Sequence, residues 1–227
     1  MLKPHEQLPM KGRSILAVDG QPLLAESCRM LEYLRNRART LTTCEILERT
    51  RGAALELESI VASVRENDIR RRPFPGKWHI ADVVDHISQT QIRGAEELRH
   101  LLSGGRPPGP PVYEALKSGA SEWAPWPSLV RGLQDANREM LSVIEIGSAA
   151  RDSNNERGSV DEIAGATVCT IVVANCKLPH GEIVPQIFIT ELNWRQYALL
   201  QRLHLLDHRT QIRKLLRALR DSGCAPG

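Results

Sequence analysis

Residues 190–220, TELNWRQYALLQRLHLLDHRTQIRKLLRALR, form the stretch of sequence that decides the fold. Its apolar residues recur at steps of three and four, which is the spacing of residues on one face of an α-helix. Two such stripes run along the stretch. The first stripe is Leu192, Leu199, Leu203 and Leu206, and the second is Tyr197, Leu200, His204, His208, Gln211 and Leu215. The stretch therefore predicts one long helix, from about Thr190 to Arg220, that packs against neighbouring helices on two sides.

Three stretches earlier in the chain have the same helical spacing. The first begins at Thr42, which has capping-box spacing with Glu45. Its apolar stripe is Ile46, Thr50, Ala53, Leu57, Ile60 and Val64. The second stretch runs from about His79, at the cap position, to Ser103, and the third runs from Pro127 to about Ile146. Proline-containing segments at residues 72–78 and 103–127 separate the stretches, because proline cannot continue a helix.

Four long helices joined by long connections predict an all-α fold, a four-helix bundle with long crossover connections. Residues 1–40 carry one more helix-like stretch, from Pro22 to Arg39, and predict an N-terminal helical extension to a bundle domain at residues 41–222. The length of 227 residues suits one such domain rather than two. Residues 166–174 are rich in β-branched side chains, and their periodicity does not separate a short strand from a buried turn of helix.

The overall composition argues against several classes of protein. Charged residues make up 25% of the chain and hydrophobic residues 41%, the balance of a soluble globular protein. The formal net charge is only +3 and the basic runs are short, so a nucleic-acid partner is not expected. The first apolar run, at residues 14–18, is too short for a signal-peptide core or a membrane span. The five cysteines lie far apart and predict reduced thiols in a cytoplasmic protein.

His204 and His208 are the first candidate functional residues. Four residues apart on a helix, their imidazoles lie on one face about one turn apart, close enough to bind a single ion. The spacing is also compatible with chance, because the chain has seven histidines. Their place on an inward-facing stripe favours a metal site, since buried imidazoles need partners for their ring nitrogens. A third ligand is expected from a facing helix, and His86 lies well inside the second helical stretch, beside Val83 and Ile87.

The other four histidines have simpler explanations as caps and loop residues. His79 is a helix cap, His5 lies in the N-terminal segment, His100 at a helix end and His180 in a turn. Asp82 and Asp85 are candidates to orient His86, although a capping or solvated carboxylate explains each of them equally well. Gln211 and Tyr197, on the histidine stripe, are further candidates for contact with the site or with a substrate. No general base stands out, so the catalytic residues stay unassigned.

Several motifs recur in an order that resembles a known family. They are Arg72-Pro-Phe-Pro-Gly-Lys-Trp78, then Asp85-His86, then Pro179-His180-Gly181, and then His204-x-x-x-His208 with Gln211-Ile212. Over about residues 42–220 the chain resembles the DinB/YfiT-like superfamily of metal-binding four-helix bundles. In that family three histidines, one on the second helix and two on the fourth, bind a divalent metal with open coordination positions. The resemblance therefore implies that His86, His204 and His208 are the metal ligands.

The resemblance implies more than one activity, because members of the family differ in what they do. Some members look like thiol S-transferases that use a low-molecular-weight thiol, some like thiol-dependent isomerases, and many are called hydrolases. The resemblance implies a metal-dependent enzyme, a thiol S-transferase or hydrolase acting on a small molecule, with one divalent ion: zinc, nickel, iron or manganese. A low-molecular-weight thiol is a further candidate cofactor and a homodimer a candidate assembly. The alternative is a non-catalytic, metal-stabilised bundle that acts in partner binding or in a stress response.

Overall fold

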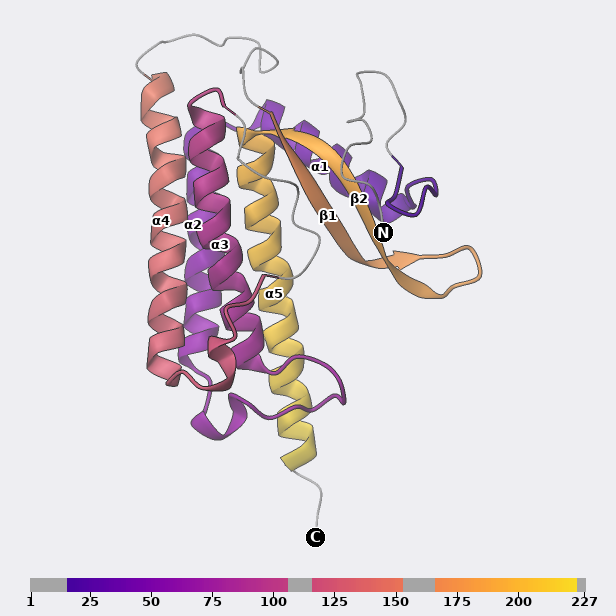
Figure 1. The fold of residues 1–227 in the computed structure, drawn as a ribbon, viewed down its shortest axis with the longest axis vertical. Helices are drawn as coiled ribbons and strands as arrows, with labels where there is room; N and C mark the ends of the chain where they lie inside the picture. The colour runs from indigo at the N-terminus through magenta and orange to yellow at the C-terminus, as the bar shows by residue number, and fades with distance from the viewer. Residues whose placement is uncertain (1–15, 106–115, 153–165, 224–227) are drawn as a thin grey trace.

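The chain is mostly helical in the computed structural model, which describes residues 16–105, 116–152 and 166–223. Four helices lie side by side along the molecule (Figure 1). They are α2 (Thr43–Ala62), α3 (Ile80–Leu102), α4 (Trp126–Asp152) and α5 (Trp194–Gly223). A fifth helix, α1 (Ala25–Thr40), lies beside α5 together with an antiparallel hairpin of β1 (Ala166–Lys177) and β2 (Ile183–Asn193). Two short 3-10 turns, η1 (Glu66–Asp68) and η2 (Ala120–Glu122), lie in the connections.

The beginnings of α2 and α3 follow from their capping residues. Thr42 and Glu45 form the predicted capping box, in which the Thr42 hydroxyl accepts from the Glu45 N–H and the Glu45 carboxylate accepts from the Thr42 N–H. His79 caps α3 in the same way, because its Nδ1 accepts from the Asp82 N–H at 3.0 Å while the Asp82 carboxylate accepts from the His79 N–H. The predictions for the start of both helices are confirmed.

The hairpin corrects the prediction of an all-α fold. Residues 166–174, whose structure the sequence left open, belong to β1, and Ile171 pairs with Phe188 in the register of the hairpin. Residues 190–193, expected to begin the last helix, are instead the end of β2. The helix begins later because Asn193 and Gln196 exchange hydrogen bonds between side chain and backbone N–H, each of 3.0 Å, and so close a capping box there.

The core consists of two apolar clusters, one toward each end of the long helices. The first gathers α1, the hairpin and adjacent parts of α3, α4 and α5, around Phe188 and Trp194, which are both fully buried. The second joins α2 to the first turns of α3 and α4 and the last turns of α5. His86 lies in the part of α3 that enters the second cluster, directly before Ile87, and His204 lies on α5 where the first cluster gives way to the second. The two helices bring these histidines within contact of one another.

The predicted helix between Pro22 and Arg39 is confirmed as α1, and a buried arginine ties it to α5. The guanidinium of Arg195 donates to the backbone carbonyl oxygens of Ala38, at 2.8 Å, and Leu41. Because these carbonyls end α1, the bonds satisfy acceptors that the helix leaves open. None of the helices in the described part of the chain is both long and apolar enough to cross a membrane.

Candidate metal centre

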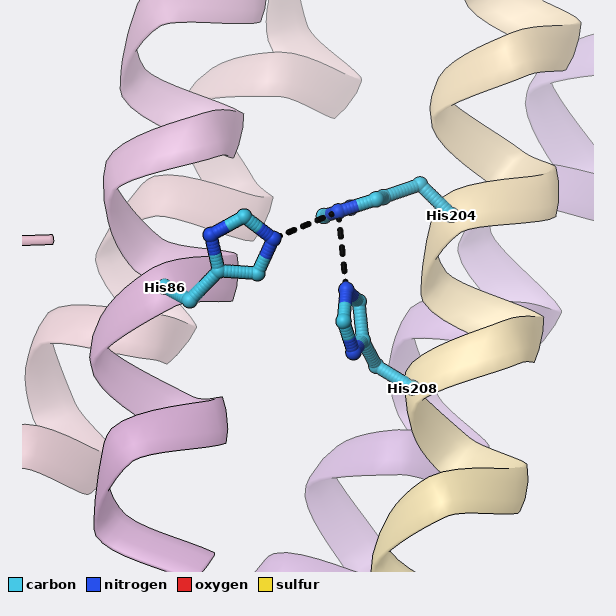
Figure 2. A group of neighbouring side chains, drawn as sticks. All are labelled: His86, His204 and His208. Carbon is cyan, nitrogen blue, oxygen red and sulfur yellow. Dashed lines mark hydrogen bonds between the residues drawn. The ribbon is translucent and has the colours of Figure 1, made fainter. Parts of the chain in front are cut away.

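Three histidine side chains from two helices converge on one point (Figure 2). His86 extends from α3, and His204 and His208 extend from successive turns of α5. The Nε2 atom of His204 lies 3.0 Å from Nε2 of His86 and 2.9 Å from Nε2 of His208. The three rings meet edge to face, with interplanar angles of 68°, 73° and 80°. The structure thus brings together the three residues that the sequence singled out.

Hydrogen bonds at the far side of two rings decide which nitrogen faces the cluster. Nδ1 of His86 lies 2.8 Å from the carbonyl oxygen of Leu116, which can only accept, so Nδ1 carries the proton. Nδ1 of His208 lies 2.7 Å from Oε1 of Gln211 and donates to it in the same way. When neutral, both rings therefore present an unprotonated Nε2 to His204. Nε2 of His204 can donate to only one of them at a time, which leaves the lone pair of the other ring without a donor.

A metal ion resolves this conflict, because it binds the lone pairs of all three nitrogens. Zinc–nitrogen bonds of about 2.0–2.1 Å at tetrahedral angles separate two ligand nitrogens by about 3.3 Å. The observed separations of 2.9 and 3.0 Å need to widen by only a few tenths of an ångström. Nδ1 of His204 is buried without a hydrogen-bond partner among the described residues, so no contact there fixes the tautomer of this ring. The residues fit a metal ion, and the group could hold one.

Burial keeps the three imidazoles neutral. Burial, together with the nearby ring of His208, lowers the pKa of His86 to about 4. Burial also lowers the pKa of His204 well below its ordinary value, and the other two rings act in the same direction. The pKa of His208 is lowered by burial too, although its hydrogen bond to Gln211 works against the change. Neutral imidazole is the form that binds metal ions, so the site is ready for a ligand role at neutral pH.

A turn from residue 116 to 119 covers His86 and is held by Asp85. The Asp85 carboxylate accepts from the Ser118 hydroxyl at 2.6 Å and from the N–H groups of Ser118 and Gly119, each at 3.1 Å. Gly119 has φ of +81°, a left-handed conformation that suits a residue without a side chain. The turn delivers the Leu116 carbonyl to the His86 ring, so Asp85 acts on its neighbour through the turn and not by direct contact.

Asp82 holds the next part of the same connection. Its carboxylate accepts from the Ser121 hydroxyl at 2.9 Å and forms an ion pair with Arg72 at 3.2 Å. The sequence left Asp82 open between orienting an imidazole of the site and capping the helix. In the structure it completes the cap with His79 and holds the 116–122 connection. Two carboxylates one turn apart on α3 therefore fasten one connecting segment against the helix.

One side of the histidine group is formed by Trp78 and Lys117. The Trp78 ring lies 5.0 Å from the His86 ring and 6.5 Å from the His208 ring, between centroids. The Lys117 ammonium lies 5.1 Å from the centre of the Trp78 ring and 3.8 Å from the Asp82 carboxylate. Lys117 therefore brings a positive charge to the rim of the site. No sequence pattern marked Lys117 or the Leu116 carbonyl, because both reach the site through the fold of a connection.

The remaining candidates from the sequence lie in different surroundings. Gln211 contacts His208 as described. Tyr197 is buried in the first apolar cluster, two helical turns before His204. The other histidines are placed as follows: His79 caps α3, His100 lies in its last turn, His180 lies at the hairpin turn 3.0 Å from Glu182, and His5 lies outside the described residues.

A second set of potential ligands lies close to the first. It consists of His79, Asp82 and the exposed Glu122. The Arg72 guanidinium lies 3.2 Å from Asp82 and 3.5 Å from Glu122, and Nδ1 of His79 already accepts from the backbone. The Arg72 guanidinium thus neutralises both carboxylates in place of a metal ion. This set of residues is explained by its role in capping α3.

A mostly helical fold with three clustered histidines, two buried and one partly buried, on two neighbouring helices defines a class of helical proteins able to hold one metal ion. The family model of the DinB superfamily matches residues 46–159, which is half of the chain, and the chain belongs to this superfamily. The matched region contains His86 and ends before α5, which carries His204 and His208. No curated protein and no solved structure matches the chain.

Proposed function

We propose that this protein is a metal-dependent enzyme, a thiol S-transferase or hydrolase that acts on a small molecule. His86, His204 and His208 are the ligands of one divalent ion: zinc, nickel, iron or manganese. A low-molecular-weight thiol serves as co-substrate in the transferase form of the proposal. The four long helices are the DinB-type bundle, within a domain at residues 41–222, and residues 1–40 are an extension to it.

One observation carries the proposal: three imidazoles meet at their Nε2 atoms, and two of them are held in the tautomer that leaves Nε2 unprotonated. Among the described residues, no cysteine or carboxylate joins this group as a fourth ligand. Three protein ligands leave positions for water or substrate, which is typical of catalytic rather than structural zinc sites. A bound ion in such a site lowers the pKa of water or a thiol and makes it a nucleophile at neutral pH.

The residues around the histidines have their own tasks in this proposal. The Leu116 carbonyl and Gln211 orient two ligand rings and keep their protons away from the ion. Trp78 excludes water from one side of the rings, and its face is also a surface on which a flat substrate could stack. Lys117, at the rim, favours a substrate that carries a negative charge.

The test begins with metal content. The full chain, purified without a histidine tag, is loaded with each of the four ions and analysed by mass spectrometry, beside His204→Ala and the control His180→Ala. We expect about one equivalent in the wild type and the control and almost none in His204→Ala. His180 is the matched control because it is an exposed histidine on the hairpin turn. Full metal retention by His204→Ala would overturn the site.

A second measurement separates an enzyme from a structural site. The cobalt-loaded protein is titrated with a small thiol and followed by visible absorption. An enzyme with open positions gives a thiolate-to-cobalt charge-transfer band, whereas a closed structural site gives no change. A band justifies a screen of thiol-transfer and hydrolysis substrates. Its absence would reject the thiol S-transferase and favour a metal-stabilised bundle that acts in partner binding.

A further inference from the structure

The outer face of the β-hairpin carries an apolar patch. Nine large hydrophobic side chains are exposed among the described residues, and five of them lie on this small part of the molecule. The five, which we call the hairpin patch, are Leu16, Val18, Val172, Ile183 and Ile187, with exposed fractions from 36% to 65%. Single exposed apolar residues are ordinary, but a contiguous set on one face marks an interaction surface.

Strand geometry puts the patch on one face. Ile187 pairs with Val172 on β1, and on its other side the N–H of Val18 donates to the Ile187 carbonyl at 2.8 Å. Side chains of directly paired residues lie on the same face of a sheet, so the three form a row across it. Their sequence neighbours Ala17, Ile171 and Phe188 point the opposite way and are buried. The hairpin is thus apolar on both faces, although only the inner face packs against the rest of the described chain.

We infer that the hairpin patch is the centre of an interface with a second copy of this chain. In a twofold dimer both copies use the same surface, so the hairpin patch must be complementary to itself. Ile183 lies four residues before Ile187 on β2 and Glu191 lies four residues after it, each about 13 Å away along the strand. Lys177 pairs with Ile183 in the register of the hairpin.

Charged residues at the two ends of the hairpin patch support a second copy of the chain as its partner. In the proposed dimer the twofold axis passes through Ile187, lies in the interface and runs across the strands. It therefore exchanges the ends of β2, so Glu191 of one copy meets Ile183 and Lys177 of the partner subunit. The meeting of opposite charges occurs twice in the dimer, once at each end. Five half-exposed aliphatic side chains present on the order of 400 Å² of apolar surface, about half of what each partner in a stable dimer buries. The patch supplies the apolar centre, and the charged ends belong to the rim.

Sedimentation equilibrium on the full-length wild-type chain, from 1 to 200 μM, tests the inference. We expect the mass of two chains over most of this range. Val172→Lys and Ile187→Lys each place a charge at the centre of the interface and raise the dimer dissociation constant at least tenfold. Leu55→Lys and Ile146→Lys are matched controls, because these exposed side chains lie on α2 and α4, away from the hairpin. Both controls stay dimeric.

A mixing experiment distinguishes a lost interface from a damaged fold. The axis brings position 172 of one copy near position 172 of the other, so Val172→Lys and Val172→Glu are each monomeric alone. Mixed in equal amounts, the two variants form a heterodimer, which a misfolded hairpin cannot do. A monomeric wild type at 200 μM, an unchanged dimer in the lysine variants, or no heterodimer on mixing overturns the inference. A monomeric wild type would mean that another segment of the chain or a different protein covers the hairpin patch. None of these results depends on metal content, so they are independent of the proposed function.

Discussion

Ser118 donates two hydrogen bonds to the carboxylate of Asp85, one from its hydroxyl at 2.6 Å and one from its backbone N–H at 3.1 Å. Two positions earlier, the backbone carbonyl oxygen of Leu116 accepts a hydrogen bond from Nδ1 of His86. One end of a short turn is thus fixed to α3 by a carboxylate while the other end fixes the tautomer of a metal-binding candidate. The link explains why a residue beside His86 can matter to the site without touching the ring.

The substitution Asp85→Ala tests this link. Without the carboxylate the turn loses three hydrogen bonds, and the Leu116 carbonyl no longer holds the His86 ring. Loss of a partner that orients a metal ligand lowers metal affinity about 10–100-fold. Competition with a chromophoric chelator measures the affinity, and nitrogen NMR of the His86 ring reports whether Nδ1 keeps its proton. Asp135→Ala, which removes an exposed carboxylate of α4, leaves both readouts unchanged; equal affinity in the two variants would contradict the link.

Gln211 gives a prediction with two opposite substitutions. Gln211→Ala removes the acceptor for Nδ1 of His208, and we expect metal affinity to fall by about tenfold. Gln211→Glu replaces the amide oxygen by a carboxylate, a stronger acceptor that raises the basicity of the ligand ring, so affinity equals or exceeds that of the wild type. The same chelator competition measures both. A loss in Gln211→Glu as large as that in Gln211→Ala would show that Gln211 does not act through the His208 ring.

Much of the helical part could be predicted because its signals are local. The stripe on α2, the cap of α3 at His79 and the pair His204 and His208 each follow from spacings of three or four residues within one helix. Periodicity also placed His86 on an inward-facing helix, and the structure brings it within 3.0 Å of His204.

The parts of the fold and of the site that could not be predicted depend on contacts between distant parts of the chain. β1 is strongly β-branched, but only its pairing with β2 makes it a strand, and no short pattern specifies that partner. The spacing of Asn193 and Gln196 did hold a usable signal for the start of α5. The Leu116 carbonyl at His86 holds none, since any residue carries a carbonyl and only the turn fixed by Asp85 brings this one to the ring.

Asp82 makes the stability of the fold depend on pH. Burial alone raises the pKa of this carboxyl, but the hydrogen bond from Ser121, with His79 and Lys117 nearby, outweighs burial and holds the pKa below its ordinary value. A lowered pKa in the folded state contributes stability above the pKa of the unfolded chain, and this contribution is lost as the pH falls through the folded pKa. We therefore expect the free energy of unfolding to decrease below about pH 4.

The comparison that isolates Asp82 is Asp82→Asn. Urea unfolding of the metal-free protein is measured from pH 7 to pH 3 for both forms. The variant is less stable at pH 7, because the ion pair with Arg72 is gone, and the difference between the two proteins narrows as the pH falls. A difference that stays constant with pH would mean that folding does not change the pKa of Asp82.

At Gly94 on α3 a methyl group has no room beside the side chains of two neighbouring helices. A Cβ atom at this position would lie 2.6 Å from Cε of Met140 and 2.9 Å from Cδ of Gln201, both of which are buried side chains. Gly94→Ala therefore forces core side chains to move, at a cost of about 1–3 kcal/mol in the free energy of unfolding, of which the better helix propensity of alanine offsets at most about 1 kcal/mol. Gly52→Ala on α2 is the matched control, since nothing lies within 4 Å of its Cβ position. There the better helix propensity of alanine stabilises the protein by up to about 1 kcal/mol. Urea unfolding of the two variants should move in opposite directions, and a stabilised Gly94→Ala would mean that the helices are not packed as closely as the structure has them.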